Sequence, residues 1–456
     1  MTYLSFIHSG TLQSAYFYIA TKLQNSYSHL STTHVFNPNK PFVISALGML
    51  ILGSVIGSIW LMTMYGVILP AELVHTIHLH KFLQLDGFIT MIILGVGYLI
   101  VPRFRNIVIP SVKLVYVSYL LILLSIIFSV TVSSLSSASF INTVLNFLAS
   151  FCRLVGVCIF SLMIMLTLRT SPKLLRLADY FIGLSVLLFV ILAFSNILNY
   201  DLISQNIQLW IMFPIIMIFG IQYKTLPSFI GFIWPRRLGS IMSAVFLTFS
   251  LGLGLASSFY HDTVLVELIF RIVLLAGVAC FTWALNIFGG FDTSDIMNLS
   301  VGEKKARYEF TLIISKLSFM LLFIGNVLSI LSVLFSDNFV LYDMWIHIIT
   351  IGFIGLTVAM YLPLMLSPIL GRPVRFIHIS KLPIWLIVIS LVIRTIGDIF
   401  VDIVSNSGGP NYVPLNFTLS LSGWIVVAAI LSFMFMVHRS INMPAKIFSQ
   451  DETTPL

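Results

Sequence analysis

The stretch AELVHTIHLHKFLQLDGFITMIILGVGYLIVPRF (residues 71–104) decides the fold class of this chain. From residue 78 to residue 101 it is an apolar run, and a helix needs about 20 such residues to cross a bilayer. The run is continuous rather than alternating, which favours a helix over a strand of a membrane barrel. Asp86 lies inside it without an obvious local partner. Polar groups are costly in hydrocarbon, so we expect Asp86 to face the interior of a bundle.

Similar apolar runs recur along the whole chain. Of its 456 residues, 59% are hydrophobic and 9% are charged, whereas soluble domains carry roughly 25% charged residues. We predict an all-α polytopic membrane protein, a bundle of about twelve transmembrane helices in a lipid bilayer. Numbered in chain order, the expected spans are 42–68, 78–101, 112–133, 141–168, 179–199, 206–231, 239–260, 264–289, 311–335, 344–366, 383–404 and 416–438.

The charges of the loops predict the orientation of this bundle. The loops after spans 3, 5, 7, 9 and 11 contain no lysine or arginine. Basic residues follow every even-numbered span instead: Arg103, Arg105, Lys113, Arg169, Lys173, Arg176, Arg236, Arg237, Lys304, Lys305, Arg307, Arg372, Arg375 and Lys381. Positive loops stay inside, so we expect both termini to be cytoplasmic and the chain to lie in the cytoplasmic membrane.

The same orientation divides the chain and explains its charge. Residues 1–40 form an N-terminal cytoplasmic or interfacial segment, 41–438 the transmembrane domain and 439–456 a cytoplasmic tail. The net charge of +8 is spread over short loops. It therefore reflects membrane topology rather than binding of nucleic acid.

Histidines gather at the predicted outer face. Five of the ten lie there, in segments far apart in sequence: His75, His78 and His80 at the start of span 2, His261 after span 7 and His347 at the start of span 10. Imidazole is a common ligand of copper, zinc and haem iron. This face is therefore the predicted location of a cofactor or metal.

One pattern in spans 2 and 10 is typical of a haem site. Gln84 and Gly87 share the helix face of His80, and Gly355 lies two turns below His347. A glycine below a histidine leaves a slot for a flat macrocycle, whose iron the two imidazoles would hold from both sides. The alternative is that the histidines bind interfacial water and the glycines mark close helix packing.

A second metal site is suggested by the spacing of the first histidines. His75 and His78 share one face if helical, and they could bind copper. The candidate metal ligands are thus His75, His78, His80 and His347. Solvated loop histidines are the alternative.

Charged residues inside the spans are candidates for internal pairing. Glu267 with Arg271, and Arg394 with Asp398, are four residues apart on one helix and can neutralise each other. Others have no obvious local partner and should face the bundle interior: Asp86, Arg153, Lys224 and Asp402.

An internal repeat relates spans 2 and 6. LGVGYLIVPRF (94–104) and FGIQYKTLPSF (219–229) share Gly-x-x-Tyr-x-x-x-Pro-x-Phe. Both stretches close an inward-running span, which indicates related helical units. The proline is expected to end the helix.

Three motifs carry a resemblance to a known family: HLHKFLQLDGFITMIILGVGYLIVPRF (78–104), FPIIMIFGIQYKTLPSFIG (213–231) and HIITIGFIGLTVAMYLPLMLSPILGRP (347–373). The chain resembles the NnrS family over most of its length, because it has these motifs in the same order and twelve spans. That family comprises haem- and copper-containing membrane proteins linked to the nitric oxide response, and it is distantly similar to haem-copper oxidase subunit I.

The resemblance implies a b-type haem between spans 2 and 10. His80 and His347 occupy the places of its axial ligands, with His78 as substitute, and Gly87 and Gly355 would make room for the ring. The relatives' His-x-His pair falls on His80 and Phe82, a departure from their pattern. Span 6 has no histidine and span 7 offers only His261, so the oxygen-reducing centre of oxidases is not expected.

The role implied is nitric oxide response or detoxification, or associated electron transfer, with other membrane subunits or a redox partner. Two alternatives stay open. One is a metal-free transporter with a polar path lined by Asp86, Arg153 and Lys224. The other is a structural subunit, similar to oxidase subunit I, without cofactors.

Overall fold

The computed structural model describes residues 39–64, 76–134, 140–198, 207–259, 264–289, 303–335, 338–370, 381–406 and 413–442. These ranges contain helices and turns and no strand. Twelve of the helical stretches within them are long and apolar enough to cross a membrane. The predicted all-α polytopic bundle is thus confirmed. The N-terminal segment and the C-terminal tail lie almost wholly outside the described residues.

The helices follow one another with short connections, and three π-helical segments interrupt or close them. In chain order they are α2 (Lys40–Met64), α3 (Thr76–Phe82), η2 (Leu83–Ile89), α4 (Thr90–Arg105), α5 (Val112–Ser134), α6 (Phe140–Thr170), α7 (Leu177–Ile197), α9 (Ile207–Thr225), η3 (Leu226–Ile230), α10 (Arg237–Phe259), α11 (Val264–Ala284), α13 (Glu303–Leu334), α14 (Phe339–His347), η4 (Ile348–Gly355), α15 (Leu356–Leu370), α16 (Leu382–Asn406) and α17 (Val413–Asn442).

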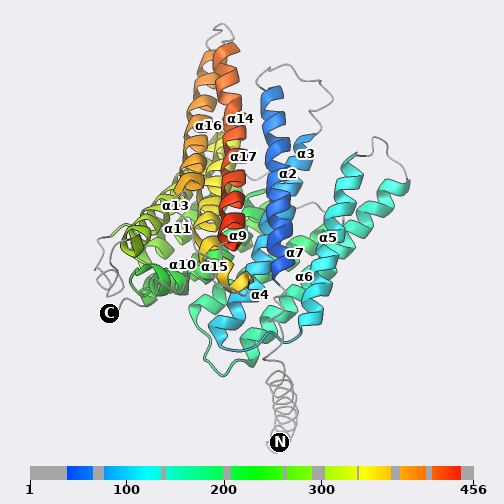
Figure 1. Cartoon of the computed structure of the whole chain (residues 1–456), viewed down its shortest axis with the longest axis vertical. Helices are drawn as coiled ribbons and strands as arrows, with labels where there is room; N and C mark the ends of the chain where they lie inside the picture. Colours follow the sequence, from blue (N-terminus) through cyan, green and yellow to red (C-terminus); the bar gives the residue numbers. More distant parts are fainter. Residues whose placement is uncertain are drawn as a thin grey trace, which may run out of the picture.

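Neighbours along the chain pack as neighbours in space, and the last span closes the bundle. α5 packs on α6, α6 on α7, α7 on α9, α10 on α11 and α16 on α17. α17 then packs against α2, and Figure 1 shows it (red) beside both α16 (orange) and α2 (blue). The first and last spans are therefore direct partners.

Two spans form the interior of the bundle. In the span Ile77–Arg105 the most apolar stretch is 89% buried, and in Ile207–Ile230 it is 83% buried. Peripheral helices instead expose large apolar side chains, such as Phe147 of α6 and Phe249 of α10. A helix that is apolar on all sides is buried, and α9 has this pattern. The peripheral helices, such as α6 and α10, instead present an apolar surface suited to lipid.

An aromatic cluster joins α9, α11, α13 and η4 at the centre. The rings of Phe219 and Phe281 are stacked with centroids 3.9 Å apart, and Phe319 stacks on Phe281 at 6.2 Å. Phe353 of η4 meets Phe219 and Phe319 edge-on. Such pairs add about 0.5–1.5 kcal/mol beyond burial, so the cluster fixes span 10 against the central helix.

The two copies of the repeat use their glycine for close packing. A Cβ on Gly95 would lie 2.8 Å from Phe42, and one on Gly220 would lie 2.7 Å from Ile182. The expectation that the proline ends the helix is wrong for Pro102, because α4 continues to Arg105 before a left-handed residue closes it. Proline removes only its own N–H donor, which other groups in a membrane bundle can offset.

Candidate functional site

Spans 2 and 10 share an uncommon local architecture. Span 2 runs α3, η2, α4 and span 10 runs α14, η4, α15. The π-helical segment begins at Leu83, shortly after His80, and at Ile348, directly after His347. π-Helical turns are rare and are frequent at functional sites. In spans 2 and 10 the π-helical segment lies next to a candidate histidine. Among the other described spans, only the one that contains α9 and η3 includes a π-helix.

His80 lies in a groove of α2. Its Nδ1 is 2.7 Å from the carbonyl oxygen of Gly53. A Cβ on Gly57 would lie 2.3 Å from the same nitrogen, so the ring lies directly on this glycine. Gly53 and Gly57 form a Gly-x-x-x-Gly pair, which lets another element approach the helix closely. Sequence reasoning missed these two residues, although that spacing was the signal.

His347 is held within its own helix and by α16. Its Nδ1 lies 2.8 Å from the carbonyl oxygen and 3.3 Å from the carboxylate of Asp343. Arg394 donates two hydrogen bonds to that carboxylate, at 2.7 and 3.1 Å. The predicted pair of Arg394 with Asp398 is present at 3.9 Å. The closer partner, Asp343, is 51 residues away and could not be found from helical spacing.

The two imidazoles are oriented alike. Each uses Nδ1 to contact a backbone carbonyl, which makes Nδ1 the protonated nitrogen and leaves the Nε2 lone pair available. Among the described residues, neither Nε2 has a hydrogen-bond partner. Both histidines therefore present the same ring nitrogen without a partner among the described residues, each from its own span.

The two glycines predicted to make room for a ring differ. A Cβ on Gly87 would lie 2.9 Å from the side chain of Met49 of α2, so this slot is filled. A Cβ on Gly355 would meet only the carbonyl of Thr350, at an ordinary 3.4 Å. A methyl group would thus fit beside Gly355, whereas the Cβ and Cγ of Met49 fill the position beside Gly87.

The remaining candidate ligands are less well placed. His78 is exposed and has no side-chain partner among the described residues, and His75 and His261 lie outside them. Within the described part of the chain, no three residues of the His, Cys, Asp and Glu types are grouped to hold a metal ion. The copper prediction therefore gains no structural support.

No protein-family model and no curated protein matches this chain. The resemblance to the NnrS family consequently rests on the motifs quoted above.

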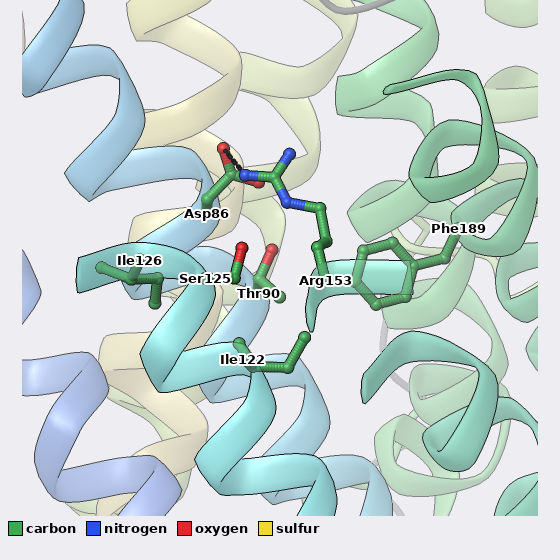
Figure 2. Close-up of a pocket in the computed structure, with 7 residues that line it drawn as sticks. All are labelled: Asp86, Thr90, Ile122, Ser125, Ile126, Arg153 and Phe189. Atoms are coloured by element: carbon green, nitrogen blue, oxygen red, sulfur yellow. Dashed lines mark ion pairs between the residues drawn. The ribbon is translucent and has the colours of Figure 1, made fainter. Parts of the chain in front are cut away.

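A second polar site lies in η2, below His80. Asp86 forms an ion pair with Arg153 of α6 at 3.0 Å. Thr90 donates to the carbonyl of Leu85, and the hydroxyl of Ser125 is buried with no hydrogen-bond partner among the described residues. Figure 2 shows both hydroxyls beside the ion pair. The cavity between them has about 10 Å³ of room, enough for roughly one water molecule.

The other charges expected to face the interior are also paired. Lys224 of α9 lies 3.8 Å from Asp179, and Arg271 pairs with Glu267 as its spacing predicts. The side chain of Asp402 lies outside the described residues. Asp86 and Arg153 thus form one pair, and Lys224 belongs to another.

Proposed function

We propose that this chain is a multi-pass membrane haem protein similar to the NnrS family. A b-type haem would lie between spans 2 and 10, with His80 and His347 as axial ligands. Its role would be in nitric oxide response or detoxification, or in associated electron transfer. The observation that carries the proposal is the shared orientation of the two histidines, which point Nδ1 at carbonyls and keep Nε2 available.

The residues present fit such a group. Metal-bound histidines usually donate their second N–H to a carbonyl or carboxylate, which fixes the tautomer and the ring. The carbonyl of Gly53 accepts such a bond from His80, and that of Asp343 accepts one from His347. The open side of Gly355 would accept a ring edge, whereas a ring beside Gly87 would require α2 to shift at Met49, because the Cβ of Met49 makes the nearest contact.

The protein's own groups would prepare the site. The carbonyl and carboxylate of Asp343 would hold the ring of His347 in place, and Arg394 neutralises that carboxylate. A bound haem would supply a redox-active iron, which with both histidines as ligands is suited to electron transfer. Nitric oxide is neutral and apolar, so it partitions into lipid and reaches a site within the membrane directly.

An absorption spectrum of the purified protein tests the proposal. We expect a Soret band and sharp α and β bands on reduction, and their loss in His80→Ala and His347→Ala. His438→Ala, near the C-terminal end of α17, is the matched control and should keep the spectrum. His78→Ala should also keep it if His80 is the ligand.

Two results would contradict the assignment. A folded wild-type protein without haem bands would exclude the proposed cofactor, and solute uptake into vesicles by that protein would favour the transporter. Full haem occupancy in His347→Ala would reject His347 as a ligand of the iron, while the protein would still be a haem protein.

A further inference from the structure

The loop between α6 and α7 is held rigidly by a buried arginine. Arg105, at the end of α4, is 1% exposed. Its guanidinium donates to the carboxylate of Asp179 at 3.0 Å and to three carbonyls, those of Leu168, Lys173 and Leu174. The hydroxyl of Ser171 in turn donates to the carbonyl of Arg105 at 2.9 Å. The loop 171–176 therefore has a fixed shape, so the side chains it carries start from defined positions.

Positive charge accumulates at this loop without matching acids. Arg105 and Lys224 both lie beside the carboxylate of Asp179. The backbone N–H of Arg176 donates to the same carboxylate, and the carbonyl of Lys173 accepts from Arg105. Arg105 already binds that carboxylate at 3.0 Å, while Lys224 stays 3.8 Å from it. Lys173 and Arg176 are exposed. Within the described residues, Asp179 is thus the one acid near these basic residues, and Arg105 already neutralises it. Lys173, Arg176 and Lys224 remain as excess positive charge.

Large apolar side chains stand between these cations. Leu174 is 88% exposed and Leu175 is 69% exposed. The loop joins two spans, next to the ends of α4 and α9, so it lies where acyl chains meet headgroups. Leucines at that depth insert into lipid, while lysine and arginine reach the headgroup phosphates. The ammonium of Lys224 lies over the ring of Phe104 at 4.8 Å, which holds it at the same rim.

We propose that this rim binds an anionic phospholipid. The headgroup phosphate would lie among Lys173, Arg176 and Lys224, and the acyl chains would lie against Leu174 and Leu175. The loop charges predict that this is the cytoplasmic face, where anionic lipids attract basic residues. The site is independent of the haem proposal, because none of its residues contacts spans 2 and 10 near the histidines.

Lipid binding to the full-length protein in detergent tests this site. Phosphatidylglycerol should bind more tightly than phosphatidylcholine by native mass spectrometry and should raise the melting temperature more. The triple variant Lys173→Gln, Arg176→Gln, Lys224→Gln should bind phosphatidylglycerol about a hundredfold more weakly, since each basic residue near a membrane surface contributes about 1 kcal/mol. Replacing Leu174 and Leu175 by serine should weaken both lipids alike.

The matched control lies on another basic loop. Arg236 and Arg237 are exposed beside the exposed apolar residues Trp234 and Leu238. Arg236→Gln with Arg237→Gln should keep the preference for phosphatidylglycerol. The proposal is overturned if the triple variant keeps that preference, if the control loses as much, or if inorganic phosphate alone reproduces the stabilisation. The last result would mean a soluble phosphate ligand.

Discussion

Spans 2 and 10 present a histidine in the same way but support it differently. The carbonyl that accepts from His80 belongs to another helix, at Gly53 of α2. The carbonyl that accepts from His347 is one turn back in its own helix, at Asp343. His80 therefore depends on how two spans pack, whereas His347 depends on a local turn and on one charged neighbour, Arg394. Equivalent roles in a site need not share the same means of support.

The largest effect is expected from removing the charge that supports span 10. Arg394→Met leaves the carboxylate of Asp343, a buried residue, without its arginine, and losing one partner of a buried pair costs about 3–5 kcal/mol. We expect a clearly lower melting temperature in detergent. Adding Asp343→Asn to this variant should restore part of the loss, since it removes the carboxylate that Arg394 binds most closely, while Asp398, 3.9 Å from Arg394, still lacks its arginine. An undiminished melting temperature in Arg394→Met would show that the pair contributes nothing.

A smaller effect is expected from closing the groove that supports span 2. Gly57→Ala places a methyl group on the ring of His80, and overpacking costs about 1–3 kcal/mol. Haem absorbance should fall with the melting temperature, while His347 keeps its contacts. Gly48→Ala is the control on the same helix, because nothing lies within 4 Å of its Cβ. Equal melting temperatures and equal haem absorbance in Gly57→Ala and Gly48→Ala would contradict the proposed role of Gly57 in seating His80.

The smallest effect on folding separates the two glycines. Gly355→Ala should leave stability unchanged or raise it by about 0.5–1 kcal/mol, because alanine suits a helix better and its methyl group meets only ordinary contact. Gly87→Ala should lower it, since Met49 must move. The larger substitution Gly355→Leu should reduce haem absorbance without lowering the melting temperature of the haem-free protein. Unchanged absorbance would place the ring elsewhere.

The fold was largely predictable because bilayer thickness imposes a length on every span. Boundaries were less certain, as α4 shows by continuing past Pro102. The π-helical segments could not be predicted. A π-helical turn contains one residue more than an α-helical turn, and it arises from packing rather than from a repeating pattern in the sequence.

The site was predictable only in part. Loop charges predict that His80 and His347 lie at one face, and the structure gives both rings the same contact from Nδ1 to a backbone carbonyl. The pairings that complete it join distant segments, as Asp343 does with Arg394 and Asp86 with Arg153. Spacing within one helix carries no information about such pairs, because they arise only when the bundle has formed.

The contact between α2 and α17 has a consequence for biosynthesis. The indole of Trp424 contacts Met62 across 362 residues of chain, and a ribosome adds about 5–20 residues per second. α2 therefore waits roughly 20–70 s before α17 is translated. Until then the helix that holds His80 lacks this neighbour on one flank, and the proposed haem would have a lateral entrance that synthesis of α17 closes.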